Sequence, residues 1–288
     1  MQLVVIGDVG GHLDELQNAL RGVGVDIAER HIPNGVTVVQ VGDLIHRGPD
    51  SSGVVALVDE MMANNGERWV QLLGNHEAQY VHREAFAWHE ELDLVSQRTL
   101  RRWVDDGSMR LAFSCDTAGV SVRRSGGRRE TIGAGGLLVT HAGLTAGCWE
   151  ALGSPMTAKD AAEAVNNGAS TMTSPVWNQG RMIEGHVCRD AGVVWAAAGD
   201  ELLAGWLDAA KQGVRMPFHQ AHGHSTAYWW GRGSWMPPKL ESELDGCSHL
   251  NSESRIVRVE VADAVVWGVD PAHGAVAAPR WAPLLLEM

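Results

Sequence analysis

The sequence predicts an α/β protein, and three observations carry that prediction. Short apolar runs alternate with helical stretches through the N-terminal half of the chain. Polar side chains follow several of those runs directly. The chain has 288 residues, of which 45% are hydrophobic, which is enough for a substantial core. Strands that alternate with helices are typical of a parallel sheet covered by helices.

Each expected element follows from its local pattern. Short β-rich apolar runs predict the strands, and Gly66 marks the expected end of the second helix. A charged stretch over 77–106 is expected to be mostly helical, and SGGRRE (125–130) is expected to be a turn. The expected order is strand 2–7, helix 12–22, strand 36–41, helix 51–66, strand 68–73, helical segment 77–106, strands 109–115, 119–124 and 135–141, helices 157–168 and 199–212, hairpin 254–270 and closing strand 275–287.

Composition excludes several classes of protein. A net charge of -12 argues against broad binding to nucleic acid or anionic membranes. The apolar stretches are too short to span a membrane, and residues 1–6 lack the basic region of a signal peptide. The four scattered cysteines show no CxxC spacing, which is typical of a reducing cytoplasm.

Five apolar runs share one polar signature at their carboxyl ends. Ligand sites in open α/β sheets gather at that edge. Carboxylates, an amide oxygen and imidazoles form mixed oxygen and nitrogen sites for divalent transition metals, and a metal pair suits phosphoryl transfer. The residues so placed are Asp8, Asp43, Asn75, His76, His141, His222 and His224.

The spacing of these residues matches a known pattern. The segments are GDVGG (7–11), GDLIHRG (42–48), GNHE (74–77), HAG (141–143) and GH (223–224). In this order they resemble the calcineurin-like metallophosphoesterase superfamily, and within it the bacterial phosphoprotein-phosphatase-like branch. The resemblance implies a four-layer αββα sandwich, with two mixed β-sheets flanked by helices. It also implies a hydrolase acting on phosphoester bonds.

The resemblance further implies two divalent ions, with Mn expected and Fe, Zn, Co or Ni as alternatives. Asp43 would bridge both ions and Asp8 would bind the first, while Asn75, His141 and His224 would complete the second site. His76 would act as general acid on the leaving group. Arg47 would hold two phosphate oxygens through its planar fork. Together with Asn75, Arg47 would contact the phosphate.

Two positions depart from the family pattern. Gly10 stands where the family has a histidine ligand for the first metal, and His46 stands where its phosphatase branch has an aspartate partner for His76. We hypothesise that His46 replaces the missing ligand. The alternatives are that His46 only hydrogen-bonds His76 or phosphate, or that the first site is weak or empty. Without its carboxylate partner, His76 is expected to be a weaker acid catalyst, which favours substrates with good leaving groups such as aryl phosphates or anhydrides.

Other candidates carry less evidence. His12 is expected to contact substrate, and the alternative is a surface or capping role. Arg181 is expected to make a second phosphate contact, with Arg189 as its alternative. His222 and His224 share a strand face, and the family match favours His224. Glu77 is expected to make structural hydrogen bonds. Six further histidines match no motif and are expected to be surface or satisfied core residues: His82, His89, His186, His219, His249 and His273.

The sequence therefore predicts one domain over residues 1–288, with a helical cap around 77–106. The expected activity is hydrolysis of a phosphomonoester at a two-metal centre, on a small molecule or a phosphoprotein. The alternatives are hydrolysis of a dinucleoside polyphosphate or another nucleotide, and a metal-binding module with weakened catalysis. The acidic charge makes nucleic acid an unexpected substrate, and the location is expected to be cytoplasmic.

Overall fold

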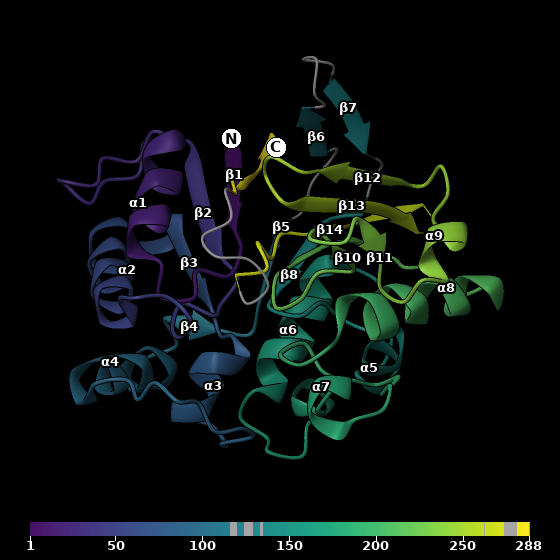
Figure 1. Cartoon of the computed structure of the whole chain (residues 1–288), viewed down its shortest axis with the longest axis horizontal. Helices are drawn as coiled ribbons and strands as arrows, with labels where there is room; N and C mark the ends of the chain where they lie inside the picture. The colour runs from purple at the N-terminus through teal and green to yellow at the C-terminus, as the bar shows by residue number, and fades with distance from the viewer. Residues whose placement is uncertain (116–119, 124–128, 133–134, 262, 274–280, 288) are drawn as a thin grey trace.

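Two β-sheets face each other between helices in the computed structural model of the chain (Figure 1). The structure describes residues 1–115, 120–123, 129–132, 135–261, 263–273 and 281–287. Helices α1 and α2 lie beside the first sheet, and α5 and α6 lie beside the second (Figure 1). This is the four-layer αββα sandwich that the sequence predicts.

The first sheet has seven strands among the described residues, in the order β4-β3-β2-β1-β15-β6-β7. Strands β1 to β4 run parallel, as the alternating pattern predicts. The closing strand β15 pairs antiparallel with β1, so the two ends of the chain lie side by side. The bounds are β1 Gln2–Ile6, β2 Val36–Gln40, β3 Trp69–Leu72, β4 Met109–Arg110, β6 Val120–Arg123, β7 Arg129–Ile132 and β15 Leu284–Glu287.

The second sheet has six strands among the described residues, in the order β12-β13-β14-β9-β8-β5. Its central strands β8, β9 and β14 run parallel, and β13 and β14 form the predicted hairpin. Strands β10 and β11 form a separate antiparallel ribbon. The bounds are β5 Ala112–Cys115, β8 Leu137–Thr140, β9 His219–His222, β10 Tyr228–Trp229, β11 Ser234–Trp235, β12 Ser248–Asn251, β13 Ile256–Val261 and β14 Ala264–Gly268.

The helices begin and end at recognisable signals. Asp50 caps α2 by accepting from the backbone of Gly53, and α2 ends before Gly66 as predicted. The bounds are α1 Leu13–Gly22, α2 Ser51–Asn65, α3 Asn75–Val81, α4 Leu94–Asp105, α5 Ala146–Ala151, α6 Ala158–Gly168, α7 Arg181–Glu184, α8 Ala204–Lys211 and α9 Leu240–Glu243. Two short 3₁₀ helices cover Gly66–Arg68 and Pro175–Trp177, and a π-helical turn covers Ala198–Leu203.

The predicted helical segment 77–106 is two helices joined by a loop. Helix α3 ends at Val81 and α4 begins at Leu94. Asp93 caps α4 by accepting from the backbone of Val95 and Ser96, a start signal that the composition of the stretch obscures. The predicted turn at 125–130 and closing strand from 275 lie partly outside the described residues.

Alternating side chains fill two separate cores. Leu3 and Val5 on β1 face the second sheet and pack with residues such as Trp267, whereas Val4 and Ile6 face the helices. Because strand side chains point to opposite faces in turn, one strand contributes to both layers. No helix in the described ranges combines the length and apolar character that a membrane crossing needs.

Candidate metal centre

The carboxyl ends of strands from both sheets meet at one edge of the sandwich. Asp8 follows β1, Asp43 follows β2, and Asn75 and His76 follow β3. Two further groups come from the second sheet, His141 after β8 and His224 after β9. The two sheets therefore present carboxylate, amide and imidazole groups to a common site.

Glycines allow the turns that carry these groups to approach one another. Asp43 adopts a left-handed backbone with φ 54°, directly after Gly42 at φ 104°. A Cβ atom at Gly42 would collide with the backbone of Gly74, and a Cβ at Gly74 would collide with Asp43. The sequence pattern Gly-Asp and Gly-Asn is thus a steric requirement of the site.

A buried carboxylate holds the two turns in place. Glu77 accepts backbone N–H groups from Asp43 and Leu44 at 2.8 Å and from Gly74 at 3.0 Å. Its side chain is fully buried. Burial, followed by the charge of Asp43, raises the pKa of Glu77 to about 8, and the three N–H donors offset part of that rise. The structural role predicted for Glu77 is confirmed by these contacts.

One group of side chains has the arrangement of a metal site. Ligand atoms of Asp43, His141 and His224 all lie within 4.8 Å of one another. The Asn75 side-chain oxygen lies 3.0 Å from His141 Nε2 and 2.8 Å from His224 Nδ1. Lone pairs on oxygen and nitrogen then converge on one point, which is favourable when a cation is held between them.

The two imidazoles of this group are in the form that binds metal. His141 Nδ1 lies 3.0 Å from the carbonyl of Val41, so that nitrogen carries the proton and Nε2 keeps its lone pair toward Asp43. Burial is the largest cause that lowers the pKa of His141, and it lowers that of His224 still further. Neutral rings, a carboxylate and an amide oxygen therefore fit a divalent transition metal.

A group of buried carboxylates lies beside this metal site. Asp8 accepts the backbone N–H of His224 at 2.9 Å. Burial raises the pKa of Asp8 well above its ordinary value, and the charges of Asp270 and Asp43 add to the rise. Burial likewise raises the pKa of Asp270 to about 6. Three neighbouring buried carboxylates call for a cation to balance them.

These carboxylates open onto a cavity of about 210 Å³. Arg47 also lines it, and its guanidinium lies 5.3 Å from the ring centre of Trp88. The lining residues are Asp8, Gly10, Asp43, Arg47, His224, Ser225, Thr226, Met236, Asp270, Ala272 and His273. The cavity thus combines metal-binding groups with a cation suited to phosphate.

His46 makes other contacts than the predicted ones. The side chain is fully buried. Its Nδ1 lies 2.6 Å from Nδ1 of His76, and its Nε2 lies 2.8 Å from the hydroxyl of Tyr80. Burial, followed by His76, lowers the pKa of His46 to about 3. This geometry favours the alternative in which His46 hydrogen-bonds His76, because both ring nitrogens are already engaged.

His76 lies between two partners. Its Nε2 is 3.7 Å from Asp43 Oδ2, opposite the nitrogen that faces His46. Burial lowers its pKa, and Asp43 opposes that shift. The loop after α3 places Phe86 and Trp88 edge-on to the His76 ring, with centroids 5.3 and 4.9 Å away. His76 is therefore held in an aromatic surround beside the metal-binding groups.

The predicted substrate contacts have different outcomes. His12, immediately before α1, stacks on His273 with ring centroids 4.3 Å apart, at the margin of the cavity. Arg181 pairs instead with Asp200, and neither residue is among those that line the cavity in the described chain. Its alternative, Arg189, lines a separate cavity beside α5 and α8. The substrate contact of Arg181 stays a prediction, and in this structure its guanidinium pairs with Asp200.

Asp270 and His273 also line this cavity, although no motif in the sequence singles out Asp270, and His273 is expected from the sequence to be a surface or satisfied core residue. They follow β14 in the segment GVDPAH, so they carry the same strand-end signature as the five recognised segments. Burial, then His12 and Arg47, lower the pKa of His273 to about 3. Asp270 could have been found by extending the strand-end rule to the last strand of the hairpin.

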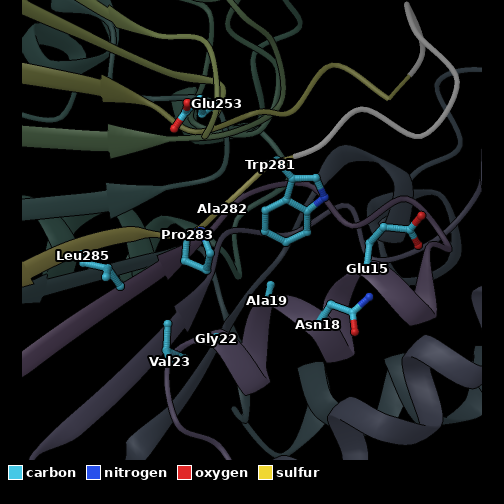
Figure 2. Close-up of a pocket in the computed structure, with 10 residues that line it drawn as sticks. All are labelled: Glu15, Asn18, Ala19, Gly22, Val23, Glu253, Trp281, Ala282, Pro283 and Leu285. Carbon is cyan, nitrogen blue, oxygen red and sulfur yellow. The ribbon is translucent and has the colours of Figure 1, made fainter. Parts of the chain in front are cut away.

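A larger cavity of about 500 Å³ lies apart from this site. Figure 2 shows Trp281 over helix α1, with Ala19 below the ring and Glu15 farther along the same helix. Its lining combines apolar side chains with a few polar ones and shares no residue with the strand-end cavity among the described residues. The metal-binding chemistry therefore belongs to the smaller cavity.

Comparison with known proteins identifies the family and the fold of the chain. The family model for calcineurin-like phosphoesterases matches residues 1–159. A mutant of a cold-active protein tyrosine phosphatase superposes with a TM-score of 0.53 at 14% identity, covering 99% of this chain and 74% of that one. Another structure of a cold-active protein tyrosine phosphatase gives 0.50 at 14% identity, with coverage of 99% and 73%. These structures share the fold of the chain.

Proposed function

Because the chain belongs to the calcineurin-like phosphoesterase family and is a phosphoester hydrolase, we propose that it hydrolyses a phosphomonoester at a centre of two divalent ions. The single observation that carries this proposal is the convergence of Asp43, His141 and His224 beside Asp8 and Arg47. Divalent ions bound there would lower the pKa of water and neutralise the charge on phosphate oxygens.

The residues of the chain divide the remaining work. Asp43, Asn75, His141 and His224 would hold one ion, and Asp8 and Asp43 would contribute to the other. Arg47 binds two phosphate oxygens through its planar fork. Because both sheets supply these groups, we treat residues 1–288 as one domain.

His76 supplies the proton to the leaving oxygen. Asp43 supports the protonated ring, but burial opposes it and lowers the pKa of His76, so less of the ring carries the proton that the leaving group needs. A leaving group that needs little protonation is then favoured. Phe86 and Trp88 beside His76 supply an apolar surround for an aromatic leaving group. An aryl phosphate, either a small molecule or the phosphorylated tyrosine of a protein, is therefore the proposed substrate class.

The size of the cavity separates this function from its main rival. A volume of about 210 Å³ accommodates a phosphate and part of its leaving group. A dinucleoside polyphosphate is much larger and extended, so the phosphomonoester is favoured. We propose Mn as the first ion to test, because carboxylates dominate the donors near Asp8. The free thiols of Cys148, Cys188 and Cys247 support a reducing, cytoplasmic location.

The test is turnover of an aryl phosphate with added Mn²⁺, comparing wild type with Asp43→Asn. We expect the variant to lose at least about 100-fold in kcat, because a group that stabilises the transition state is weakened. Asp105→Asn, an exposed change at the end of α4, is the matched control and should keep wild-type turnover. Undiminished turnover in Asp43→Asn, or none with any divalent ion, would remove the enzyme mechanism and leave the weakened binding module.

A further inference from the structure

The first metal site lacks a nitrogen ligand from the expected positions. Gly10 has no side chain, and both ring nitrogens of His46 are engaged by His76 and Tyr80. Asp8 and Asp43 then remain as the only family-derived groups for that ion. Any further ligand must come from another segment that reaches the same cavity.

The chain that leaves β14 reaches it. Strand β14 runs parallel to β9, and beyond its end the N–H of Val269 donates to the carbonyl of His222 at 2.8 Å. On the other side, a Cβ at Gly7 would collide with the carbonyl of Val269. The backbone before Asp270 is therefore fixed between the turn that carries Asp8 and the turn that carries His224. Asp270 itself is 8% exposed and lines the cavity.

A tight turn then brings His273 back over the cavity. Asp270 Oδ1 accepts the N–H of Ala272 at 2.7 Å, and Ala272 has a left-handed backbone with φ 61°. The His273 ring stacks on His12 with an interplanar angle of 21°. Stacking on His12 fixes the plane of the ring.

The two ring nitrogens of His273 are unpaired among the described residues. Both are shielded from solvent, and neither forms a hydrogen bond there. The backbone of Asp8 lies next to the ring and raises the pKa of His273, against the larger opposing effect of burial. Buried polar atoms are normally satisfied, so an unpaired imidazole beside three carboxylates indicates a missing partner that is a cation.

We propose that Asp270 and His273 are ligands of the first metal ion, with His273 supplying the nitrogen that the family draws from the position of Gly10. This inference rests on the proposed two-metal function. The donor set would be three carboxylates and one imidazole, richer in oxygen than the site of Asn75, His141 and His224. Carboxylate-rich sites suit Mn, whereas imidazole also suits Zn and Fe, so the two sites differ in preference.

The experiment measures metal per chain by mass spectrometry, after loading with Mn²⁺ and removing free ion. We expect two ions in wild type, one in His273→Ala and one in Asp270→Asn. His46→Ala should keep two, as should the matched control His249→Ala on the exposed face of β12. Electron paramagnetic resonance should show a coupled Mn pair in wild type and an isolated ion in His273→Ala.

Direct ligation is tested with His273→Cys loaded with Co²⁺. A thiolate on the ion gives sulfur-to-cobalt charge-transfer absorption, which His273→Ala cannot show. Two ions in His273→Ala, or full loading of His273→Cys without that absorption, would overturn the proposal for His273. One ion in His46→Ala and two in His273→Ala would restore His46 as the ligand. Fewer than two ions in wild type would overturn the two-metal function itself.

Discussion

Replacing His46 by aspartate should strengthen the acid catalyst. In the structure His46 and His76 share a 2.6 Å contact between their Nδ1 atoms. Two nitrogens at this distance hold one proton between them, so neither ring gains a charged partner. His46→Asp places a carboxylate in that position, and a carboxylate stabilises the protonated form of His76.

The magnitude follows from the separation of the charges. A carboxylate and an imidazolium about 4 Å apart attract by about 4 kcal/mol at an effective dielectric constant of about 20. At about 1.36 kcal/mol per unit, that attraction alone would raise the pKa of His76 by about 3 units. Burying the new carboxylate opposes the gain, which leaves a net rise of about 1 to 2 units.

The assay is the pH dependence of kcat for an aryl and an alkyl phosphate. Because His76 must be protonated to act, its alkaline limb should move up by about 1 to 2 pH units in His46→Asp. The alkyl phosphate should gain more, since its leaving group depends more on protonation. Tyr80→Phe, which removes the other partner of His46 without adding charge, should leave the limb in place. An unmoved limb in folded His46→Asp would refute the reasoning.

Three further outcomes are expected. Glu77→Gln puts an amide against backbone N–H donors and should lower the free energy of unfolding by about 1 to 3 kcal/mol in urea, while exposed Glu84→Gln changes it by less than about 0.5 kcal/mol. Burial lowers the pKa of His222 to about 4, so between about pH 6.5 and pH 4 the unfolded chain binds a proton that the folded chain does not. As the pH falls through this range, the free energy of unfolding of the metal-free wild type should decrease by up to about 1.4 kcal/mol per pH unit more than that of His222→Asn, measured by urea titration. Trp88→Ala removes the ring beside His76 and should reduce the aryl-over-alkyl ratio of kcat/KM by about 2- to 10-fold, and an unchanged ratio would exclude the ring from substrate preference.

The strands and the first helices could be predicted because their local patterns agree with their final environments. Residues 2–7 alternate between two apolar cores, so the strand carries its own signal. Segment 77–106 is harder to predict, because its many charged residues hide the loop between α3 and α4. That loop ends at Asp93, which caps α4. Its loop is set by the contacts of Phe86 and Trp88 with His76, which local propensity does not encode.

The motif residues converge because each lies at a strand end, and that rule depends only on local sequence and on parallel pairing. The residue that replaces a missing ligand cannot be predicted by this rule. It depends on which segment, distant in the sequence, passes beside the ligand position left vacant at Gly10. The second motif offered His46 as the replacement for the ligand that is missing at Gly10. The turn of His46 and Arg47, both with left-handed backbones, instead directs the His46 ring toward Tyr80.

The conformation at Gly10 explains why a ligand from another segment is a workable solution. Gly10 has φ 54°, where a residue with a side chain costs about 1 to 2 kcal/mol. A Cβ there would touch the carbonyl of His46 at 3.4 Å and the side chain of Arg47 at 3.6 Å, which is ordinary van der Waals contact. The glycine relieves that backbone strain, while the chain after β14 already runs beside Asp8. Under the proposed ligation, an imidazole at 273 therefore serves the same ion without strain in the turn that positions Asp8.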